Sequence, residues 1–148
     1  MAEPRPLRIL IVEDNEERKL RLCSWLPPDI RPVVAVSAGR AIGILSRDRG
    51  TVYAGVLLDH DLQEHGASEM DPFLSGQDVA QAIIQYLPRS VMILIHSVNA
   101  SRSPVMALQL MKSGFDVTQI PMNILTEERL RDWIDEVRER GIENMQSS

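Results

Sequence analysis

The sequence offers few means of holding the chain together other than an aliphatic core. It contains a single cysteine, Cys23, so no internal disulfide can form. The helical spacing of Cys23 with Leu20 and Trp25 predicts a packing role for this thiol rather than a reactive one. Aromatic residues make up only 4% of the chain. Aliphatic side chains must therefore fill the core, and 148 residues suffice to bury one as a single domain.

Signals for membranes and for nucleic acid are also missing. The first residues, "MAEPRP", contain no apolar signal region, and no run approaches the ~20 apolar residues that span a bilayer. The net charge of −5 argues against a broad basic surface and leaves room only for a local basic groove. We therefore expect a cytoplasmic protein with no membrane contact and no DNA-binding domain in this chain.

The hydrophobic pattern alternates between two periods along the chain. Five short segments rich in branched residues and bounded by turn formers are predicted strands: 7–12, 32–36, 54–58, 91–96 and 115–120. Segments with helical spacing follow them: 16–26, 38–47, 77–87, 105–113 and 126–140. Strand followed by helix, five times, predicts right-handed crossovers and a parallel sheet with helices on both faces. The fold class is therefore α/β.

The last predicted helix is amphipathic. Thr126 is its expected N-cap, with acidic residues in the first turn. Four apolar residues share one face and should lie in the core: Leu130, Trp133, Ile134 and Val137. The sequence contains no internal repeat, so we expect one domain over residues 7–140 and a frayed tail over 141–148.

Polar residues stand where three predicted strands end. These groups are Glu13-Asp14-Asn15 after the first strand, Asp59-His60-Asp61 at the third and His96-Ser97-Val98-Asn99 at the fourth. In open α/β sheets the functional site lies beyond the carboxyl ends of the strands. Carboxylates that converge there repel one another unless a cation neutralises them, and their hard oxygens suit Mg²⁺ or Mn²⁺. The pattern predicts a metal site with Glu13, Asp14, Asp59 and Asp61.

Some of these residues also have simpler explanations. Asp14 or Asn15 is expected at the start of a helix as an N-cap, whether or not a metal is bound nearby. His60 and His96 are equally consistent with acid–base chemistry and with hydrogen-bonded support for the acids. The metal interpretation depends on the three groups occurring together.

The motifs resemble the receiver domain of two-component response regulators. "ILIVEDN", "GVLLDHDL", "SGQDVAQAI", "MILIHS" and a late "IP" occur in the receiver order. The resemblance implies a flavodoxin-like fold with five parallel strands in the order 2-1-3-4-5. It also implies that Glu13 and Asp14 bind Mg²⁺, that Asp59 accepts a phosphoryl group, that the backbone carbonyl of Asp61 meets the metal, and that the Ser97 hydroxyl contacts the phosphoryl group.

One departure from the receiver pattern concerns a cation. Receivers carry a lysine directly before the proline that follows the fifth strand, where it pairs with the phosphorylated aspartate. This sequence has Ile120 before Pro121. Lys112 and Arg102 are the candidates for replacing it through space.

A second departure is the length of the loop after Asp59. Receivers reach the glycine of the third helix over a shorter span than the one that ends at Gly76, so residues 60–75 form an insertion. The insertion carries four ionisable residues: Glu64, His65, Glu69 and Asp71. Two interpretations stay open, a lid or selectivity element at a phosphate site and a tolerated surface insertion.

The departures are similar to one branch of the family, the cyclic-phosphate processing receiver domains. "LLDHDL", "HSVN" and "MALQLMKSGFDVTQIP" match that branch's signatures. The resemblance implies action on cyclic phosphate ends, such as those of cleaved RNA. Asp61 and Asn99 match the two positions that, in receivers, flank the attacking water during loss of the phosphoryl group. Mg²⁺ would polarise the phosphodiester, and an Asp or His would move the proton. The candidate catalytic residues are Asp59, His60, His96, Ser97 and Asn99.

Three classes of function remain open from the sequence. The first is an enzyme that opens cyclic phosphates. The second is a signalling receiver, phosphorylated on Asp59 by a histidine kinase and acting through a separate output protein. The third is a pseudo-receiver that only binds a partner. The acidic residues argue against the third class, and the missing lysine and the "HSVN" motif argue against the second.

Overall fold

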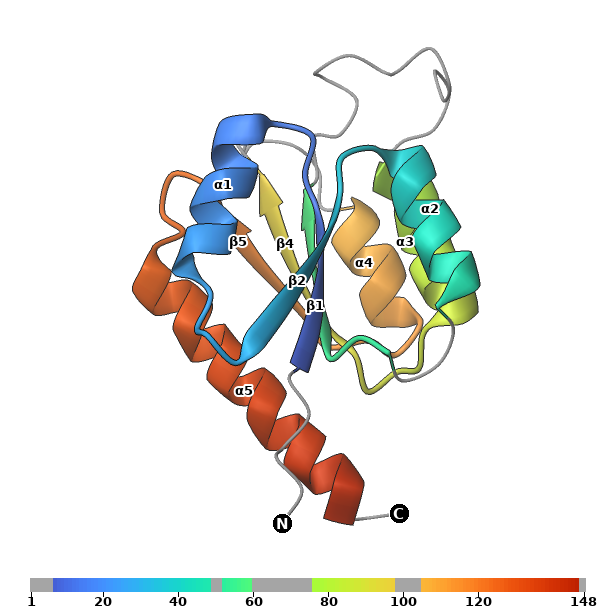
Figure 1. The fold of residues 1–148 in the computed structure, drawn as a ribbon. Helices are drawn as coiled ribbons and strands as arrows, with labels where there is room; N and C mark the ends of the chain where they lie inside the picture. Colours follow the sequence, from blue (N-terminus) through green and yellow to red (C-terminus); the bar gives the residue numbers. More distant parts are fainter. Residues whose placement is uncertain (1–6, 49–51, 60–75, 98–104, 147–148) are drawn as a thin grey trace.

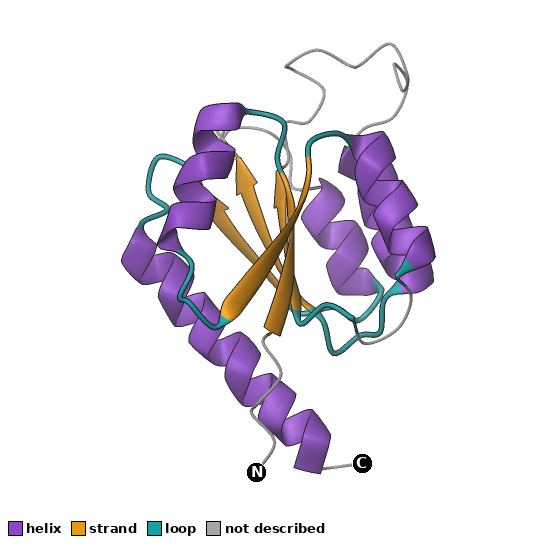
Figure 2. Cartoon of the chain, viewed as in Figure 1, coloured by secondary structure: helices purple, strands orange, loops and turns teal. Residues whose placement is uncertain are grey.

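The fold is a five-stranded parallel sheet between two layers of helices (Figures 1 and 2). The computed structural model describes residues 7–48, 52–59, 76–97 and 105–146. The strands are β1 (Leu7–Val12), β2 (Ile30–Ala35), β3 (Gly55–Asp59), β4 (Met92–Ser97) and β5 (Val117–Pro121). The helices are α1 (Glu16–Trp25), α2 (Ala38–Arg47), α3 (Gly76–Tyr86), α4 (Val105–Lys112) and α5 (Glu127–Gln146). The order β2-β1-β3-β4-β5 confirms the predicted fold.

Each face of the sheet has its own apolar core. Helices α1 and α5 cover one face, and α2, α3 and α4 cover the other (Figure 1). Side chains alternate between the faces along a strand, so Ile9 and Ile11 pack toward α1 and α5, whereas Leu10 and Val12 pack toward the other three helices. Strand β3 is buried along its whole length. A strand that is buried on both faces reads as a continuous apolar run, as this sequence does.

The predicted packing of α5 and of the cysteine is confirmed. The four apolar residues of α5 are buried, and Thr126 Oγ1 accepts a hydrogen bond from the backbone N–H of Arg129 at 3.2 Å. Trp133 lies so close to Gly55 that a Cβ added there would be 2.7 Å from the indole. Cys23 is partly buried against the same core, and burial raises the pKa of its thiol.

Three predicted boundaries were wrong by two residues or more. Strand β2 begins at Ile30 rather than Pro32, because a proline is compatible with an edge strand. Strand β5 begins at Val117, and Phe115 is buried in the core before it. Helix α5 continues to Gln146, so the expected tail from residue 141 starts too early. None of the helices in the described ranges is both long enough and apolar enough to cross a membrane.

Candidate functional site: a buried acidic cluster at the carboxyl edge of the sheet

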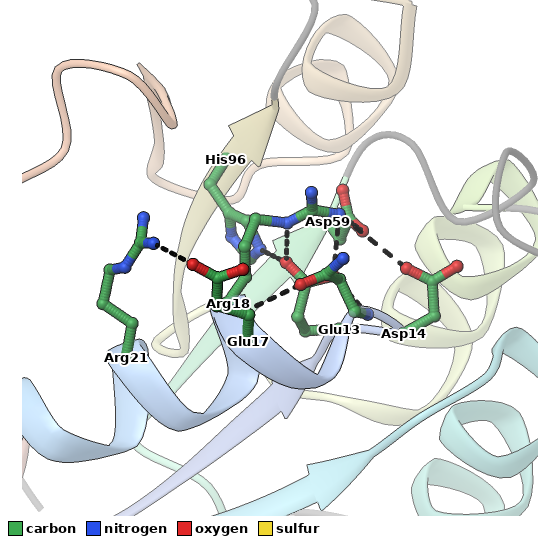
Figure 3. A network of polar contacts seen from close by, with 8 residues as sticks. Glu13, Asp14, Glu17, Arg18, Arg21, Asp59 and His96 are labelled. Carbon is green, nitrogen blue, oxygen red and sulfur yellow. Dashed lines mark hydrogen bonds and ion pairs between the residues drawn. The ribbon is translucent and has the colours of Figure 1, made fainter.

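Two neighbouring strands bring the acidic residues together. Strand β1 ends at Val12, directly before Glu13 and Asp14, and β3 ends in Asp59. The two strands pair in parallel, with Val12 opposite Leu58, so their carboxyl ends lie at one edge. Figure 3 shows these carboxylates from β1 and β3 facing the start of α1. The prediction that the strand ends converge is confirmed for these residues.

Glu13 is the most enclosed member of the cluster. Its side chain is fully buried, and its backbone N–H donates to the carbonyl of Ala35 at 3.1 Å. Its Oε1 accepts a hydrogen bond from Nε of Arg18 at 2.9 Å, and its Oε2 accepts from the backbone N–H of Asn15 at 3.1 Å. Burial opposes ionisation, but hydrogen bonds with His96 and Arg18 outweigh it and hold the pKa of Glu13 well below its usual range. Glu13 is therefore a buried anion.

His96 joins the cluster from β4. It lies opposite Asp59 in the strand register, is fully buried, and places Nε2 3.1 Å from Oε1 of Glu13. Because Glu13 is ionised and can only accept, the proton of this hydrogen bond belongs to Nε2. Nδ1 of His96 is buried and has no hydrogen-bond partner among the residues that the structure describes. Of the two interpretations of His96, hydrogen-bonded support for an acid is directly visible.

Arg18 supplies the cation that the acids require. It extends from the first turn of α1, only 12% of its side chain is exposed, and its guanidinium faces the carboxylates (Figure 3). One terminal nitrogen donates to Oε2 of Glu13 at 3.2 Å and lies 3.6 Å from Oδ2 of Asp59 and 4.0 Å from Oδ1 of Asp14. Burial acts to lower the pKa of Arg18, but pairing with Glu13 raises it overall. The guanidinium therefore stays charged among three carboxyl groups.

Different residues cap helix α1 and contribute to the acidic cluster. Asn15 is the N-cap, and its side-chain oxygen accepts a hydrogen bond from the backbone N–H of Arg18 at 2.9 Å. Asp14 is therefore not needed as a cap, and its mostly buried side chain belongs to the acidic cluster instead. The alternative left open by the sequence is thus resolved in favour of Asn15.

The structure places only part of the predicted set. Glu13, Asp14, Asp59 and His96 are brought together. Ser97 is the last residue of β4, next to His96. The remaining predictions lie outside the described residues: His60, Asp61, Asn99 and the four ionisable residues of the 60–75 insertion.

Of the two candidates for replacing the receiver lysine, Lys112 lies away from the site. This residue lies in the last turn of α4, the helix that returns the chain from the end of β4 to the start of β5. Lys112 therefore lies at the amino end of the parallel strands, whereas Asp59 lies at their carboxyl end. Ile120 pairs with His96 in the register, beside the site, and brings no charge. Arg102 lies outside the described residues.

Sequence reasoning missed Arg18. The available signal was its spacing, since Arg18 follows Asp14 by four residues and thus returns to the same side of α1. On the sequence alone this spacing is that of an ordinary surface ion pair. Nothing in it shows that the side chain reaches across to Asp59 on another strand.

The donor atoms of the cluster fit a divalent cation. One ligand atom each from Glu13, Asp59 and His96 lie within 4.8 Å of one another, and all three residues are buried. Carboxylate oxygens suit Mg²⁺ and Mn²⁺, and an imidazole is compatible with Mn²⁺. Of the predicted metal ligands, Glu13 and Asp59 thus belong to a buried cluster that could hold an ion, together with His96.

Comparisons of sequence alone find no relative. No model of a protein family matches the chain, and no curated protein matches it.

Comparison of structures identifies the fold. The signal receiver domain of a Luxo repressor protein from Vibrio parahaemolyticus matches with a TM-score of 0.69 and 19% identity, over 98% of this chain and 99% of that one. A CheY-like response regulator receiver domain protein from Methanospirillum hungatei matches with a TM-score of 0.69 and 18% identity, over 93% and 98%. The receiver domain of a sensor histidine kinase from Pseudomonas aeruginosa, solved with a magnesium ion in its active site cleft, matches with a TM-score of 0.65 and 20% identity, over 88% and 95%. The chain has the receiver fold.

Proposed function

We propose that this chain is a receiver-type phosphoacceptor whose Asp59 takes a phosphoryl group in a reaction that depends on a divalent cation. The observation that carries the proposal is the position of Asp59. It ends the central strand β3 of a receiver fold, beside the buried Glu13 and within 3.6 Å of the Arg18 guanidinium. A carboxylate in this setting has a positive charge beside it that can stabilise the negative charge of an incoming phosphoryl group.

The reaction itself needs little from the protein besides position and charge. A carboxylate oxygen of Asp59 attacks the phosphorus of the donor, and the bond from phosphorus to the donor's leaving atom breaks with its electron pair. The product is an acyl phosphate on Asp59. Because Asp59 is almost fully buried, the surrounding charges act in a medium of low dielectric, where they are strong.

Glu13, Asp14 and Asp59 would hold the divalent cation, Mg²⁺ or Mn²⁺, which when bound neutralises charge on the phosphoryl oxygens. The magnesium ion in the Pseudomonas aeruginosa receiver domain supports this assignment. His96 donates a hydrogen bond to Oε1 of Glu13 and so helps to orient this carboxylate.

The partners follow from the same chemistry. A phosphohistidine on a histidine kinase is the expected donor, and a separate protein is the expected output, with both reactions in the cytoplasm. The similar structures include a response regulator receiver domain protein and the receiver domain of a sensor histidine kinase, which supports this class of partner.

The test is to label the purified chain with a small phosphodonor, acetyl phosphate, in the presence of Mg²⁺. Intact mass spectrometry should show the gain of one phosphoryl group that is lost in mild base. Asp59→Asn should abolish the gain, whereas Asp116→Asn, which removes a carboxylate from an exposed ion pair with Arg140, should leave it unchanged. Equal labelling of Asp59→Asn, or no labelling of the wild type, contradicts the proposal.

A second candidate is favoured by His96, which lies opposite Asp59 in the strand register. In this candidate the site opens a cyclic phosphate, for example on an RNA end. Water adds to phosphorus, one ester bond breaks, and the imidazole moves the proton to or from the reacting oxygen. The assay is Mg²⁺-dependent opening of a 2′,3′-cyclic nucleotide. His96→Ala should lower that rate by about 10²-fold or more.

A further inference from the structure

The proposed function does not explain why the Arg18 guanidinium lies at the centre of the acidic cluster, in contact with Glu13 as well as near Asp59. Its Nε and one terminal nitrogen hold the two oxygens of Glu13 at 2.9 and 3.2 Å. This forked contact fixes the plane of the guanidinium. The same terminal nitrogen then lies 3.6 Å from Asp59 and 4.0 Å from Asp14. One nitrogen therefore stands at the point toward which all three carboxylates converge.

That point is also where a divalent cation would have to bind. Magnesium needs carboxylate oxygens at about 2.1 Å, and it brings two positive charges with it. A guanidinium nitrogen already within hydrogen-bond distance of Glu13 fills part of this space and repels the ion. Since Arg18 is buried with its partners, solvent screens this repulsion only weakly.

We propose that Arg18 is a built-in counter-cation that holds the acids together without metal and competes with the divalent ion for them. Metal binding then requires the guanidinium to break its two hydrogen bonds to Glu13. Arg18 thereby lowers the metal affinity of the site and makes occupancy depend on the cation concentration. The inference deepens the proposed function, because it concerns the regulation of that same site.

The test compares Mn²⁺ binding by the wild type and by three variants of the full chain. The electron paramagnetic resonance signal of free Mn²⁺ measures the binding. Arg18→Gln removes the competing charge, so it should tighten the Mn²⁺ dissociation constant by about tenfold or more. Arg18→Lys keeps the charge and should stay close to the wild type. Arg21→Gln is the matched control, because it removes a charge from the same helix at an exposed pair with Glu17. It should change the dissociation constant less than about twofold.

A second measurement, the melting temperature with and without Mn²⁺, distinguishes a competing charge from a purely structural role of Arg18. Without metal, Arg18→Gln should melt at a lower temperature than Arg21→Gln, because it leaves the buried Glu13 with one ion-pair partner fewer. With saturating Mn²⁺ the deficit should shrink, since the ion restores the lost positive charge. A structural role of Arg18 alone would lower the melting temperature equally with and without the ion.

The inference is overturned if Arg18→Gln binds Mn²⁺ no more tightly than the wild type, if Arg21→Gln tightens binding as much, or if neither wild type nor Arg18→Gln binds the ion. The acetyl phosphate assay on the same preparations keeps the two proposals apart. Tighter Mn²⁺ binding by Arg18→Gln without any acyl phosphate on the wild type would contradict only the proposed function. Acyl phosphate on the wild type with unchanged Mn²⁺ affinity in Arg18→Gln would contradict only the role of Arg18.

Discussion

Two arginines of this chain each pair with several carboxylates, one inside the site and one on the surface. Arg18 contacts Glu13 and Asp59, whose side chains are 0% and 1% exposed. Arg138 of α5 donates to Asp29, in the segment before β2, at 3.1 Å and to Asp135 at 2.8 Å. Those two carboxylates are 56% and 63% exposed. The chemical groups are alike, and burial is what differs.

The comparison distinguishes the surface pairs of Arg138, which link two parts of the fold, from the buried network of Arg18, which apolar side chains could replace. On the surface, water screens the ion pairs of Arg138. These pairs connect α5 to the segment before β2 with little cost in desolvation. In the interior, Glu13 and Arg18 have lost their hydration, and apolar residues of similar size would often be as stable there. A buried network of this kind at the carboxyl edge of the sheet therefore indicates a functional site.

The largest effect should come from removing the buried anion. Glu13→Ala leaves Arg18 and His96 without their shared partner in the interior. The free energy of unfolding in urea, measured without metal, should fall by about 3–5 kcal/mol. Glu16→Ala is the control, because Glu16 is exposed and pairs with Lys19 at the surface, and it should cost less than about 1 kcal/mol. Equal losses in the two variants would erase the distinction between buried and surface networks.

A smaller effect should appear in acid. The folded state lowers the pKa of Glu13, so this group stabilises the protein above its unfolded pKa, near 4.3. That stability should be lost progressively as the pH falls below about 5 toward the folded pKa. Urea unfolding in the presence of a chelator should therefore show that Glu13→Gln and the wild type differ less at about pH 3 than at pH 7. A difference that stays constant with pH would contradict an ionised Glu13.

The smallest effect should come from the surface network. Arg138→Gln should lower the free energy of unfolding by less than about 1 kcal/mol, and added salt should reduce the effect further. Arg18→Gln, measured beside it without metal, should lose more and respond less to salt. A loss at Arg138 as large as at Arg18 would mean that burial is not the deciding variable.

The sequence predicts the sheet and much of the site, because both follow from local patterns. Parallel strands end at one edge, so Glu13, Asp14, Asp59 and His96 could be placed together without coordinates. The role of Arg18 could not be predicted in this way. Whether its side chain turns toward Asp59 or toward solvent depends on how α1 packs against the sheet.

The errors at the ends of elements have similar causes. Pro32 suggested the start of a strand, but β2 lies at the edge of the sheet, where a missing N–H is tolerated. The last helix was predicted to end at residue 140, before Gly141, yet α5 continues through this glycine to Gln146. In both cases the conformational preference of one residue was outweighed by the strand or helix in which it lies.

The most direct test of the central claim, that the buried acidic cluster binds a divalent cation for phosphoryl chemistry, is the melting temperature with and without millimolar Mg²⁺. An ion that binds only the folded state stabilises it by mass action, so the wild type should melt at a higher temperature with Mg²⁺. Asp59→Asn, which removes one of the carboxylates, should lose most of that gain, and Asp116→Asn should keep it. A wild type whose melting temperature ignores Mg²⁺, or an Asp59→Asn variant that gains as much as the wild type, would contradict the account.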